Sequence, residues 1–488
     1  MKIKKIKVQN FRLLKDFEID LEDELSLVIG KNNTGKTSLL TVLNKFLNTG
    51  SFSFDDFNID LKDQLKKLMS ESISDDYNSL GITLKLFIEY NRTDYLANVS
   101  QVMMDLDPQN NYIVLAFEYL MDADKLKLLK ESFEEFRVKE LAKKTEKNGK
   151  GEEYEVKDLF FYLRRNHSIY FDLSTKSVLY DIVEKKEDDS KFLDLRDFKN
   201  VVKNIINFKY ISAKRGVNNK ENDKTLSLQT SEIYEKTESK DENDEEIEKF
   251  KDQLIETDDS LTEIYKPLFK KVVNKVKRFG GVKENDSLIK IESSLQDRNL
   301  LKGNTTVKYT HEKDVLPEHH NGLGYMNLIS MIFEIEILIQ DFKKKKDEKP
   351  ADINLLFIEE PEAHTHPQMQ YIFINNIKEF LGEGIVKGDD SRELQTIIST
   401  HSSHIVSECK FNDIKYLKKE NANGIVSKNL SALEKDYLEN GKEQAYKFLK
   451  QYLTLHRSEL FFADKAILIE GDTERILLPA MMKKIDQN

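Results

Sequence analysis

The sequence contains few of the residues that mark secreted, membrane-spanning or fibrous proteins. Its 488 residues include one cysteine, Cys409, no tryptophan and seven prolines. A single cysteine excludes an intramolecular disulfide and is typical of the reducing cytoplasm, where we expect the chain to be located. No continuous apolar run approaches the roughly 18 residues that span a bilayer, and the N-terminal segment lacks the apolar core of a signal peptide. We therefore expect no membrane partner.

The chain also lacks the excess of basic residues that marks many nucleic-acid-binding proteins. It has 76 basic and 87 acidic side chains, which give a net charge of −11. Any contact with DNA must therefore be local. One basic cluster with interleaved apolar residues lies at 266–278. It is typical either of the solvated face of an amphipathic helix or of a DNA contact.

A phosphate-binding loop follows a short apolar strand near the N-terminus. Residues 25–29 run directly into Gly30-Lys31-Asn32-Asn33-Thr34-Gly35-Lys36-Thr37, the complete G-x-x-x-x-G-K-[ST] pattern, and helical spacing follows from Ser38 to Leu47. In this strand–loop–helix context Lys36 reaches the β- and γ-phosphates and the Thr37 hydroxyl binds Mg²⁺. The sequence therefore predicts binding of ATP with Mg²⁺. The nucleotide contacts that we expect are Asn33, Thr34, Gly35, Lys36, Thr37 and Ser38.

Two downstream strands end in side chains suited to nucleotide hydrolysis. The apolar strand 355–358 ends at Glu359 and Glu360, and the strand 394–398 leads to His401. Glu359 suits Mg²⁺ through water, and Glu360 suits orienting the attacking water. Adjacent strand residues point to opposite faces, so a bend at the strand end must separate these two roles. His401 either hydrogen-bonds the γ-phosphate or caps the next helix.

Strands and helices alternate around these motifs, which predicts an α/β fold with a mainly parallel sheet covered by helices. Further strands are expected at 3–8, 17–21, 81–90, 112–117, 168–173, 177–182 and 465–469. Helices are expected at 246–279, 330–342 and 368–380. The tract 143–151 is expected to be a loop, and the acidic stretch 238–248 is either a solvated helix or a loop. The long separation between the phosphate loop and Gly322 predicts a largely helical insertion.

Together these segments resemble the head of the ABC-type ATPases that serve chromosome maintenance and recombination. The stretch Asn321-Gly322-Leu323-Gly324-Tyr325 resembles their signature segment, although it departs from the common Leu-Ser-Gly-Gly form. In such ATPases ATP is buried between two subunits, and the partner's signature segment caps the γ-phosphate. The resemblance implies this role for Gly322 and Gly324, a nucleotide contact for Arg12, and the switch-histidine role for His401. It assigns no Q-loop residue.

More specifically, the chain resembles the overcoming-lysogenisation-defect (OLD) family of ATP-dependent nucleases. The matching stretches are residues 209–215, the Gly322 segment and residues 460–475. In that family the last stretch opens a Toprim domain, whose first glutamate binds a divalent metal for DNA cleavage. Glu470 matches this glutamate, and Glu474 is a second candidate carboxylate for Mg²⁺ or Mn²⁺. Because few residues follow, we expect either that the chain is a fragment or that a separate subunit supplies the remaining carboxylates.

The resemblance implies an ATPase with the first strand and helix of a Toprim fold. The expected divisions are the N-terminal part of the ATPase domain at 1–215, a helical dimerisation insertion at 216–300, the C-terminal part of the ATPase domain at 301–450, and the start of the Toprim domain at 451–488. The expected assembly is a homodimer or higher homo-oligomer whose ATP-driven dimerisation regulates DNA cleavage in defence against phage. The alternatives are a repair or recombination ATPase without a nuclease, and a sensor ATPase that controls a separate effector.

Overall fold

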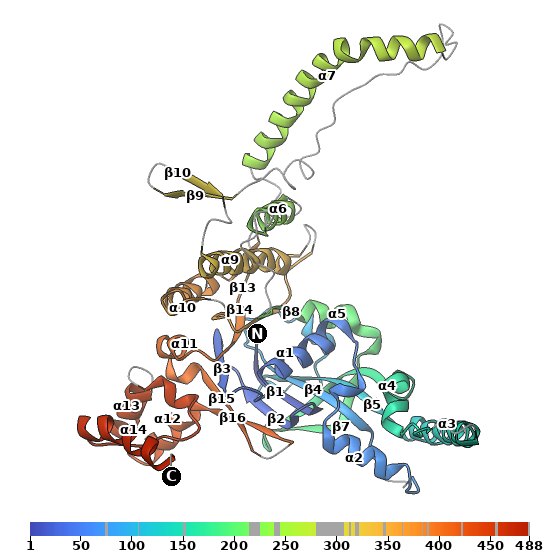
Figure 1. The fold of residues 1–488 in the computed structure, drawn as a ribbon, viewed down its shortest axis with the longest axis vertical. Coiled ribbons are helices and arrows are strands. Elements are labelled where there is room, and N and C mark those ends of the chain that lie inside the picture. The colour runs from blue at the N-terminus through green and yellow to red at the C-terminus, as the bar shows by residue number, and fades with distance from the viewer. Residues whose placement is uncertain are drawn as a thin grey trace.

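Two six-stranded β-sheets covered by helices form the body of the protein (Figure 1). The structure is a computed structural model. It describes residues 1–73, 77–105, 107–149, 153–213, 225–238, 245–279, 307–311, 314–317, 322–344, 348–363, 365–382, 384–387, 390–420, 423–453 and 457–486. The predicted α/β class is confirmed.

One sheet is almost entirely parallel and contains the strands that carry the motifs. Its order is β16-β15-β3-β14-β11-β8, and only the β15–β16 pair is antiparallel. Its strands are β3 (Leu25–Gly30), β8 (Ile206–Ile211), β11 (Ile353–Glu359), β14 (Leu394–Thr400), β15 (Ile414–Lys419) and β16 (Ile425–Asn429). Every residue of β3, β11 and β14 is buried, which explains why these strands are continuous apolar runs rather than alternating ones.

The two faces of the parallel sheet contact two separate hydrophobic cores. Alternate residues of β11 point to opposite faces, so Leu355 and Phe357 belong to one core and Leu356 and Ile358 to the other. The first core also contains α1 (Lys36–Asn44) and the inner face of the second sheet. The phosphate-loop helix is therefore packed between the two sheets.

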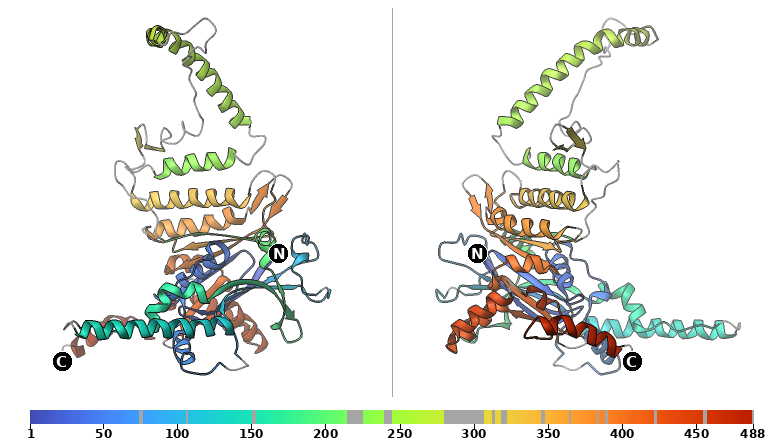
Figure 2. Two further views of the ribbon diagram at one scale, coloured as in Figure 1. Left: turned by 90° about the vertical axis from the view of Figure 1, so that its right-hand side faces the viewer. Right: turned by 60° about the vertical axis from the view of Figure 1, so that its left-hand side comes forward.

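The second core lies between the parallel sheet and a stack of helices (Figure 2). The helices that contribute to this core are α9 (Leu323–Phe342), α10 (Pro367–Gly382) and α11 (Ser403–Glu408), and α6 (Thr225–Glu238) packs on α9. The amide of Gln229 on α6 donates to the carbonyl of Ser330 on α9 at 3.2 Å, and Lys236 forms an ion pair with Asp341 at 2.9 Å. By length and composition α9 is a candidate membrane span, but it packs on the sheet with half of that window buried.

The second sheet is antiparallel and was not predicted as a separate unit. Its order is β2-β1-β4-β5-β6-β7. Its strands are β1 (Lys2–Phe11), β2 (Leu14–Asp20), β4 (Leu80–Glu89), β5 (Tyr112–Met121), β6 (Asp172–Asp181) and β7 (Lys186–Asp194). Alternation of apolar and charged residues in β1 and β2 buries one face and exposes the other, where lysines pair with acidic side chains such as Lys7 with Glu18 and Glu187.

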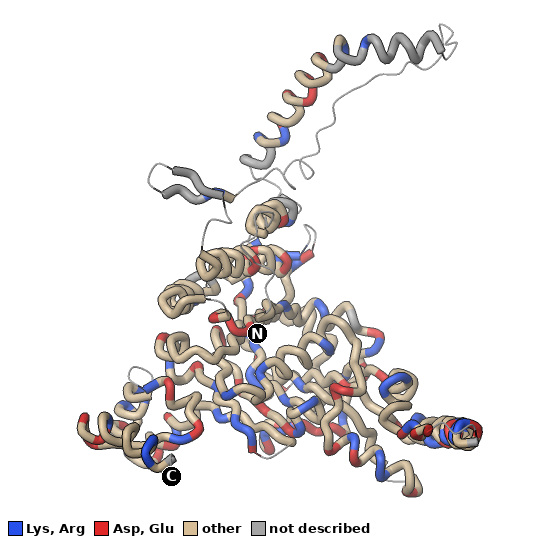
Figure 3. Tube along the Cα trace, viewed as in Figure 1, with Lys and Arg blue, Asp and Glu red and all other residues tan. Residues whose placement is uncertain are grey.

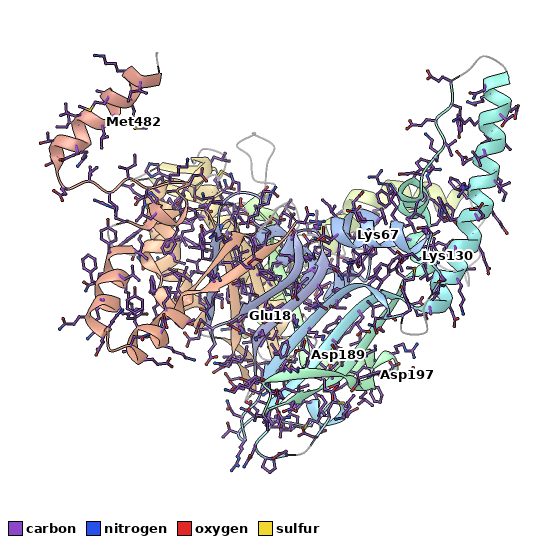
Figure 4. The ribbon with its side chains drawn as sticks, turned by 90° about the horizontal axis from the view of Figure 1, so that it is seen from below. Glu18, Lys67, Lys130, Asp189, Asp197 and Met482 are labelled. Atoms are coloured by element: carbon purple, nitrogen blue, oxygen red, sulfur yellow. The ribbon has the colours of Figure 1, made fainter. Side chains whose placement is uncertain are left out.

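Several helices extend beyond this body. The long helices α3 (Ala123–Gly149) and α7 (Glu245–Phe279) project in different directions, and α14 (Asp472–Asp486), which carries Met482, projects in a third (Figures 1 and 4). The remaining elements are η1 (Lys45–Thr49), η2 (Phe54–Asp56), α2 (Ile59–Leu68), η3 (Val99–Gln101), α4 (Leu159–Tyr170), η4 (Arg196–Phe198), α5 (Lys199–Ile205), β9 (Lys308–His311), β10 (Asp314–Pro317), β12 (Ile385–Lys387), β13 (Asp390–Arg392), η6 (Phe411–Asp413), α12 (Leu430–Glu439), α13 (Glu443–Gln451) and η8 (Ser458–Phe461).

Three local predictions are wrong. Residues 168–170 end the helix α4, and the strand that we expected at 168–173 starts only at Asp172. The expected loop at 143–151 is helical through Gly149, because its polar residues form the solvated end of α3. The segment 465–469 is not a strand, since it lies exposed and pairs with no strand in the described part of the chain.

Two other predictions fall partly outside the described residues. The structure places the basic cluster 266–278 in α7, but the side chains beyond residue 270 are not described, and neither are residues 239–244 of the acidic stretch. Over the rest of the chain, basic and acidic residues are interspersed (Figure 3).

Candidate functional site

The phosphate loop lies at the carboxyl end of β3, and both Asn33 and Gly35 in it have a positive φ. Gly35 has a φ of 84° and precedes the first residue of α1, so the chain turns through the left-handed region that glycine adopts without strain. A Cβ atom at this position would lie 2.9 Å from Ile425 Cδ1 and 3.1 Å from Leu14 Cδ2. Asn33 also has a positive φ, of 60°, which asparagine tolerates better than most residues.

Lys36 is buried within this loop. Its Nζ donates hydrogen bonds to the carbonyls of Gly30 at 2.8 Å and Lys31 at 2.9 Å, and the residue is only 5% exposed. Burial lowers the pKa of Lys36 to about 8, although the nearby carboxylates of Glu360, Glu362 and Glu359 oppose this shift. A buried cation surrounded by acids is suited to binding a phosphate together with a divalent cation.

Glu359 and Glu360 are separated by the bend that the sequence required. Glu359 ends β11 and is buried, and its Oε2 accepts a hydrogen bond from the backbone N–H of Ala213 at 3.3 Å. Glu360 has a φ of 44°, an unusual value for a residue with a side chain, while its N–H donates to the carbonyl of Ser399 on β14 at 2.9 Å. The bend leaves Glu359 within the sheet edge and places the Glu360 carboxylate against His401.

The structure gives His401 a partner within the site rather than a role as a helix cap. Its Nε2 lies 3.2 Å from Glu360 Oε1, whereas Ser402 caps α11 by accepting from the N–H groups of His404 and Ile405. Burial, and then the positive charge of Lys36, lower the pKa of His401 to about 4. The imidazole is therefore neutral at physiological pH, and the 3.2 Å contact fits an Nε2–H that donates to the carboxylate.

Glu362 also belongs to this site, although the sequence analysis assigned it no role. Its Oε1 accepts a hydrogen bond from the backbone N–H of His401 at 2.5 Å, and burial raises the pKa of its carboxyl group. The contact joins the segment after β11 to the segment after β14. The Glu-Pro-Glu spacing was the only signal in the sequence, and it gave no indication of a main-chain partner 39 residues away.

Arg12 is held in place by a buried aspartate. Its Nε and Nη2 donate to Asp56 Oδ1 at 3.1 and 2.9 Å, and Asp56 also pairs with Lys45 at 2.9 Å. The backbone N–H of Arg12 donates to the carbonyl of Asp56 at 2.8 Å. The guanidinium is 37% exposed, so it is fixed in position but open to solvent. A nucleotide contact for Arg12 stays a prediction.

The Gly322 segment lies at the start of a helix and is open to solvent. Gly322 precedes the first residue of α9, and a Cβ atom built there would meet nothing within 4 Å. Gly324, the other glycine of the segment, is the second residue of the helix. The described contacts of α9 are with α6, α10 and β8, so the segment faces outward from its own chain. This exposure fits contact with a second subunit, which stays a prediction.

The structure does not bring the C-terminal carboxylates into a metal site. Glu470 lies in an exposed bend just before α14, and Glu474 is exposed in the first turn of that helix. No group of three or more potential metal ligands occurs among the described residues. Two exposed glutamates do not hold a catalytic metal alone. The phosphate loop fits Mg²⁺ better, since this ion takes few protein ligands beside phosphate and water and Thr37 and Glu359 supply such oxygens.

Comparison with known proteins identifies the family of the chain. Residues 1–406 match the family described as AAA ATPase domain. The chain belongs to the AAA ATPase domain family. Residues 461–488 match the family described as overcoming lysogenization defect protein-like, TOPRIM domain, so the resemblance to the OLD family is confirmed.

The curated relatives that the chain matches are named as nucleases. The chain is 28% identical to Endonuclease GajA of Bacillus cereus over 94% of its own length and 65% of that protein. It is 28% identical to the Old nuclease of Escherichia phage P2 over 30% of its own length and 23% of that protein. The chain thus spans about two thirds or less of these relatives. A crystal structure of the SmcHead bound to the C-winged helix domain of ScpA is 12% identical, covering 89% of this chain and 100% of that chain, with a TM-score of 0.39 that is too low to carry an argument.

Glu362→Ala should lower the kcat of ATP hydrolysis about tenfold or more, because losing a buried hydrogen-bond acceptor costs about 1–3 kcal/mol and frees the main chain at His401. Glu362→Gln keeps an oxygen for that N–H and should retain most of the activity. Steady-state kinetics test both, with Glu443→Ala on the exposed face of α13 as the matched control. A wild-type kcat for Glu362→Ala would exclude this role.

His401 should remain neutral as the pH is lowered from 7 to 5, because its pKa of about 4 lies below the ordinary value of 6.5. In the unfolded chain His401 has its ordinary pKa of 6.5, so it is protonated at a higher pH than in the folded chain. Protonation therefore favours the unfolded state, and the contribution of His401 to the free energy of unfolding falls as the pH drops from 6.5 toward 4. Titration of histidine ring signals by NMR measures the pKa, with His401→Gln to assign the resonance. A midpoint near 6.5 would contradict the burial argument.

Proposed function

We propose that the chain hydrolyses ATP and that hydrolysis regulates a metal-dependent DNA endonuclease of the OLD type. The observation that carries the proposal is the convergence of Lys36, Glu360 and His401 at the carboxyl ends of three neighbouring parallel strands. A phosphate-binding cation, a carboxylate that orients water and a hydrogen-bond donor for the γ-phosphate are groups that suit hydrolysis of a phosphoanhydride. The C-terminal match to the TOPRIM domain adds the nuclease part of the proposal.

Each side chain has a separate role in this mechanism. The N–H groups from Asn33 to Lys36 hold the phosphates, and Lys36 lies against the β- and γ-phosphates. Thr37 and Glu359 hold Mg²⁺, which neutralises phosphate charge when bound. Glu360 orients the attacking water, and His401 exchanges its hydrogen bond to Glu360 for one to the γ-phosphate, since the single Nε2–H serves one acceptor at a time.

A second copy of the chain completes the site in this proposal. The Gly322 segment and the N–H groups at the start of α9 face outward, where they can cap a γ-phosphate bound to a partner subunit. The helix α7, which projects from the body, lies in the insertion for which we propose the dimerisation role. We propose a homodimer or higher homo-oligomer whose geometry changes with hydrolysis.

The C-terminal segment supports the proposal of a Toprim nuclease completed by further chain. Ile467 and Leu468 are 65% and 83% exposed, and Ile476 and Ile485 on α14 are 72% and 74% exposed. An apolar strand sequence followed by an amphipathic helix gains stability only when other strands and helices cover it. We propose that the rest of a Toprim domain, from this polypeptide or a separate subunit, covers this surface and joins Glu470 and Glu474 with further carboxylates that hold Mg²⁺ or Mn²⁺.

The substrate proposed for this nuclease is DNA, and its biological role is defence against phage in the cytoplasm. A repair ATPase without a nuclease is the weaker alternative, since it does not account for the match of residues 461–488 to the TOPRIM domain. A sensor ATPase that controls an unrelated effector is weaker for the same reason.

Glu360→Gln should bind ATP normally but turn it over at least about 100-fold more slowly, because a neutral amide orients and polarises the attacking water much less than a carboxylate does. The ATP-bound dimer should then accumulate. Phosphate release measures turnover, and light scattering in size-exclusion chromatography measures the dimer. Glu393→Gln, a 72% exposed acid that pairs with Lys2, is the control. Unchanged turnover in Glu360→Gln would remove its assigned role.

Glu470→Ala should abolish cleavage of supercoiled plasmid DNA, because a nuclease metal site loses a ligand. The assay uses the chain together with the polypeptide that completes its Toprim domain. It is run in Mg²⁺ or Mn²⁺, with and without ATP. ATP hydrolysis should persist in the variant, which separates the two activities. Cleavage that continues at the wild-type rate would show that Glu470 is not a metal ligand.

A further inference from the structure

The segment that leads to Glu470 lies directly on the ATP-binding site. The short helix η8 packs against α11, the helix that follows His401. Phe461 is 9% exposed, and its ring centroid lies 6.2 Å from that of Tyr416 on β15. The ring centroid of the next residue, Phe462, lies 6.5 Å from the imidazole centroid of His401, with the planes tilted by 44°. His401 therefore lies next to both Phe462 of the C-terminal segment and Glu360.

A second contact joins the same segment to the phosphate loop. Asp464 forms an ion pair with Lys31, the residue that follows Gly30 in the loop. The carboxylate of Asp464 is 89% exposed and Lys31 is 35% exposed, so water screens this pair and it contributes little alone. The ring contact between Phe462 and His401 is partly buried and is therefore less screened by water.

We propose that Phe462 is a positioning residue for His401, and that residues 458–464 transmit the nucleotide state of the ATP-binding site to Glu470. The inference rests on the proposed function, in which the imidazole changes its hydrogen-bond partner when the γ-phosphate is present. A ring that turns toward the phosphate must change its contact with Phe462. Phe461 is anchored in the hydrophobic core, so the displacement passes to the chain that follows Phe462.

Only a short stretch of chain separates the contacts at the ATP-binding site from Glu470. Asp464 lies six residues before Glu470, and six residues span at most about 20 Å when fully extended. The intervening residues 465–469 form no regular secondary structure. In the described structure no helix or strand therefore lies between Asp464 and the candidate metal ligand.

In this proposal Phe462 acts directly on His401, so its positioning role is testable on the ATPase reaction alone. Phe462→Ala should lower the kcat of ATP hydrolysis about five- to tenfold, with the KM for ATP changed by less than about twofold, since the ring orients His401 and does not touch ATP. Phe462→Tyr keeps the ring and should retain nearly full activity.

Phe448→Ala is the matched control for this kinetic test. Phe448 is 68% exposed on α13, and its ring lies 5.8 Å from Tyr452, so its loss removes an aromatic residue from the C-terminal region without touching the ATP-binding site. Thermal unfolding midpoints within about 3 °C of wild type verify that the variants fold. A kcat for Phe462→Ala equal to that of Phe448→Ala overturns the positioning role.

Hydrogen exchange provides the second test, with Glu360→Gln as the background so that ATP stays bound. Addition of ATP with Mg²⁺ should change exchange several-fold in peptides covering 458–470. In the double variant Phe462→Ala/Asp464→Asn this change should disappear, while protection of peptides covering 30–40 persists. If 30–40 is not protected, the proposed ATP site itself is wrong. If 30–40 is protected and 458–470 does not respond, only the transmission proposal is overturned.

Discussion

Parallel pairing of β3, β14 and β11 is the constraint on which the rest of the site depends. Because the carboxyl ends of parallel strands lie at one edge of a sheet, residues more than 300 positions apart in the chain meet there without a dedicated loop. The pairing also makes the burial of Lys36 tolerable, since the carboxylates that follow β11 surround its charge. Without this edge, Lys36 would be an uncompensated buried cation.

The bend at Glu360 shows how the sheet edge gives two adjacent glutamates different environments. A positive φ at a residue with a side chain costs on the order of 1–3 kcal/mol. Here the surrounding hydrogen bonds hold it, because the N–H of Glu360 still pairs with Ser399 and its carbonyl accepts from Ala363. The result is a buried Glu359 that faces Ala213 and a Glu360 carboxylate that faces the histidine. Strained backbone conformations of this kind are common at functional sites.

The sequence alone predicted the parts of this fold whose signal is local. Continuous apolar runs identified β3, β11 and β14, and the glycine spacing identified the loop between β3 and α1. The role of Glu362 was missed because its partner is a main-chain group on another strand. The predicted strand at 465–469 failed for the opposite reason: its apolar pattern is local, but a strand also needs a neighbour, and Leu468 lies 83% exposed. The pattern of side chains thus identified individual strands and helices. Only the tertiary structure shows which of them are in contact.

The most direct test of the account is equilibrium binding of ATP with Mg²⁺ to the wild-type chain and to Lys36→Ala, measured by isothermal titration calorimetry. The account predicts saturable binding by the wild-type chain and its loss in a variant that remains folded, because Lys36 is the buried cation of the phosphate loop. Normal ATP affinity in Lys36→Ala would contradict the assignment of the phosphate loop, and with it the proposed mechanism of hydrolysis.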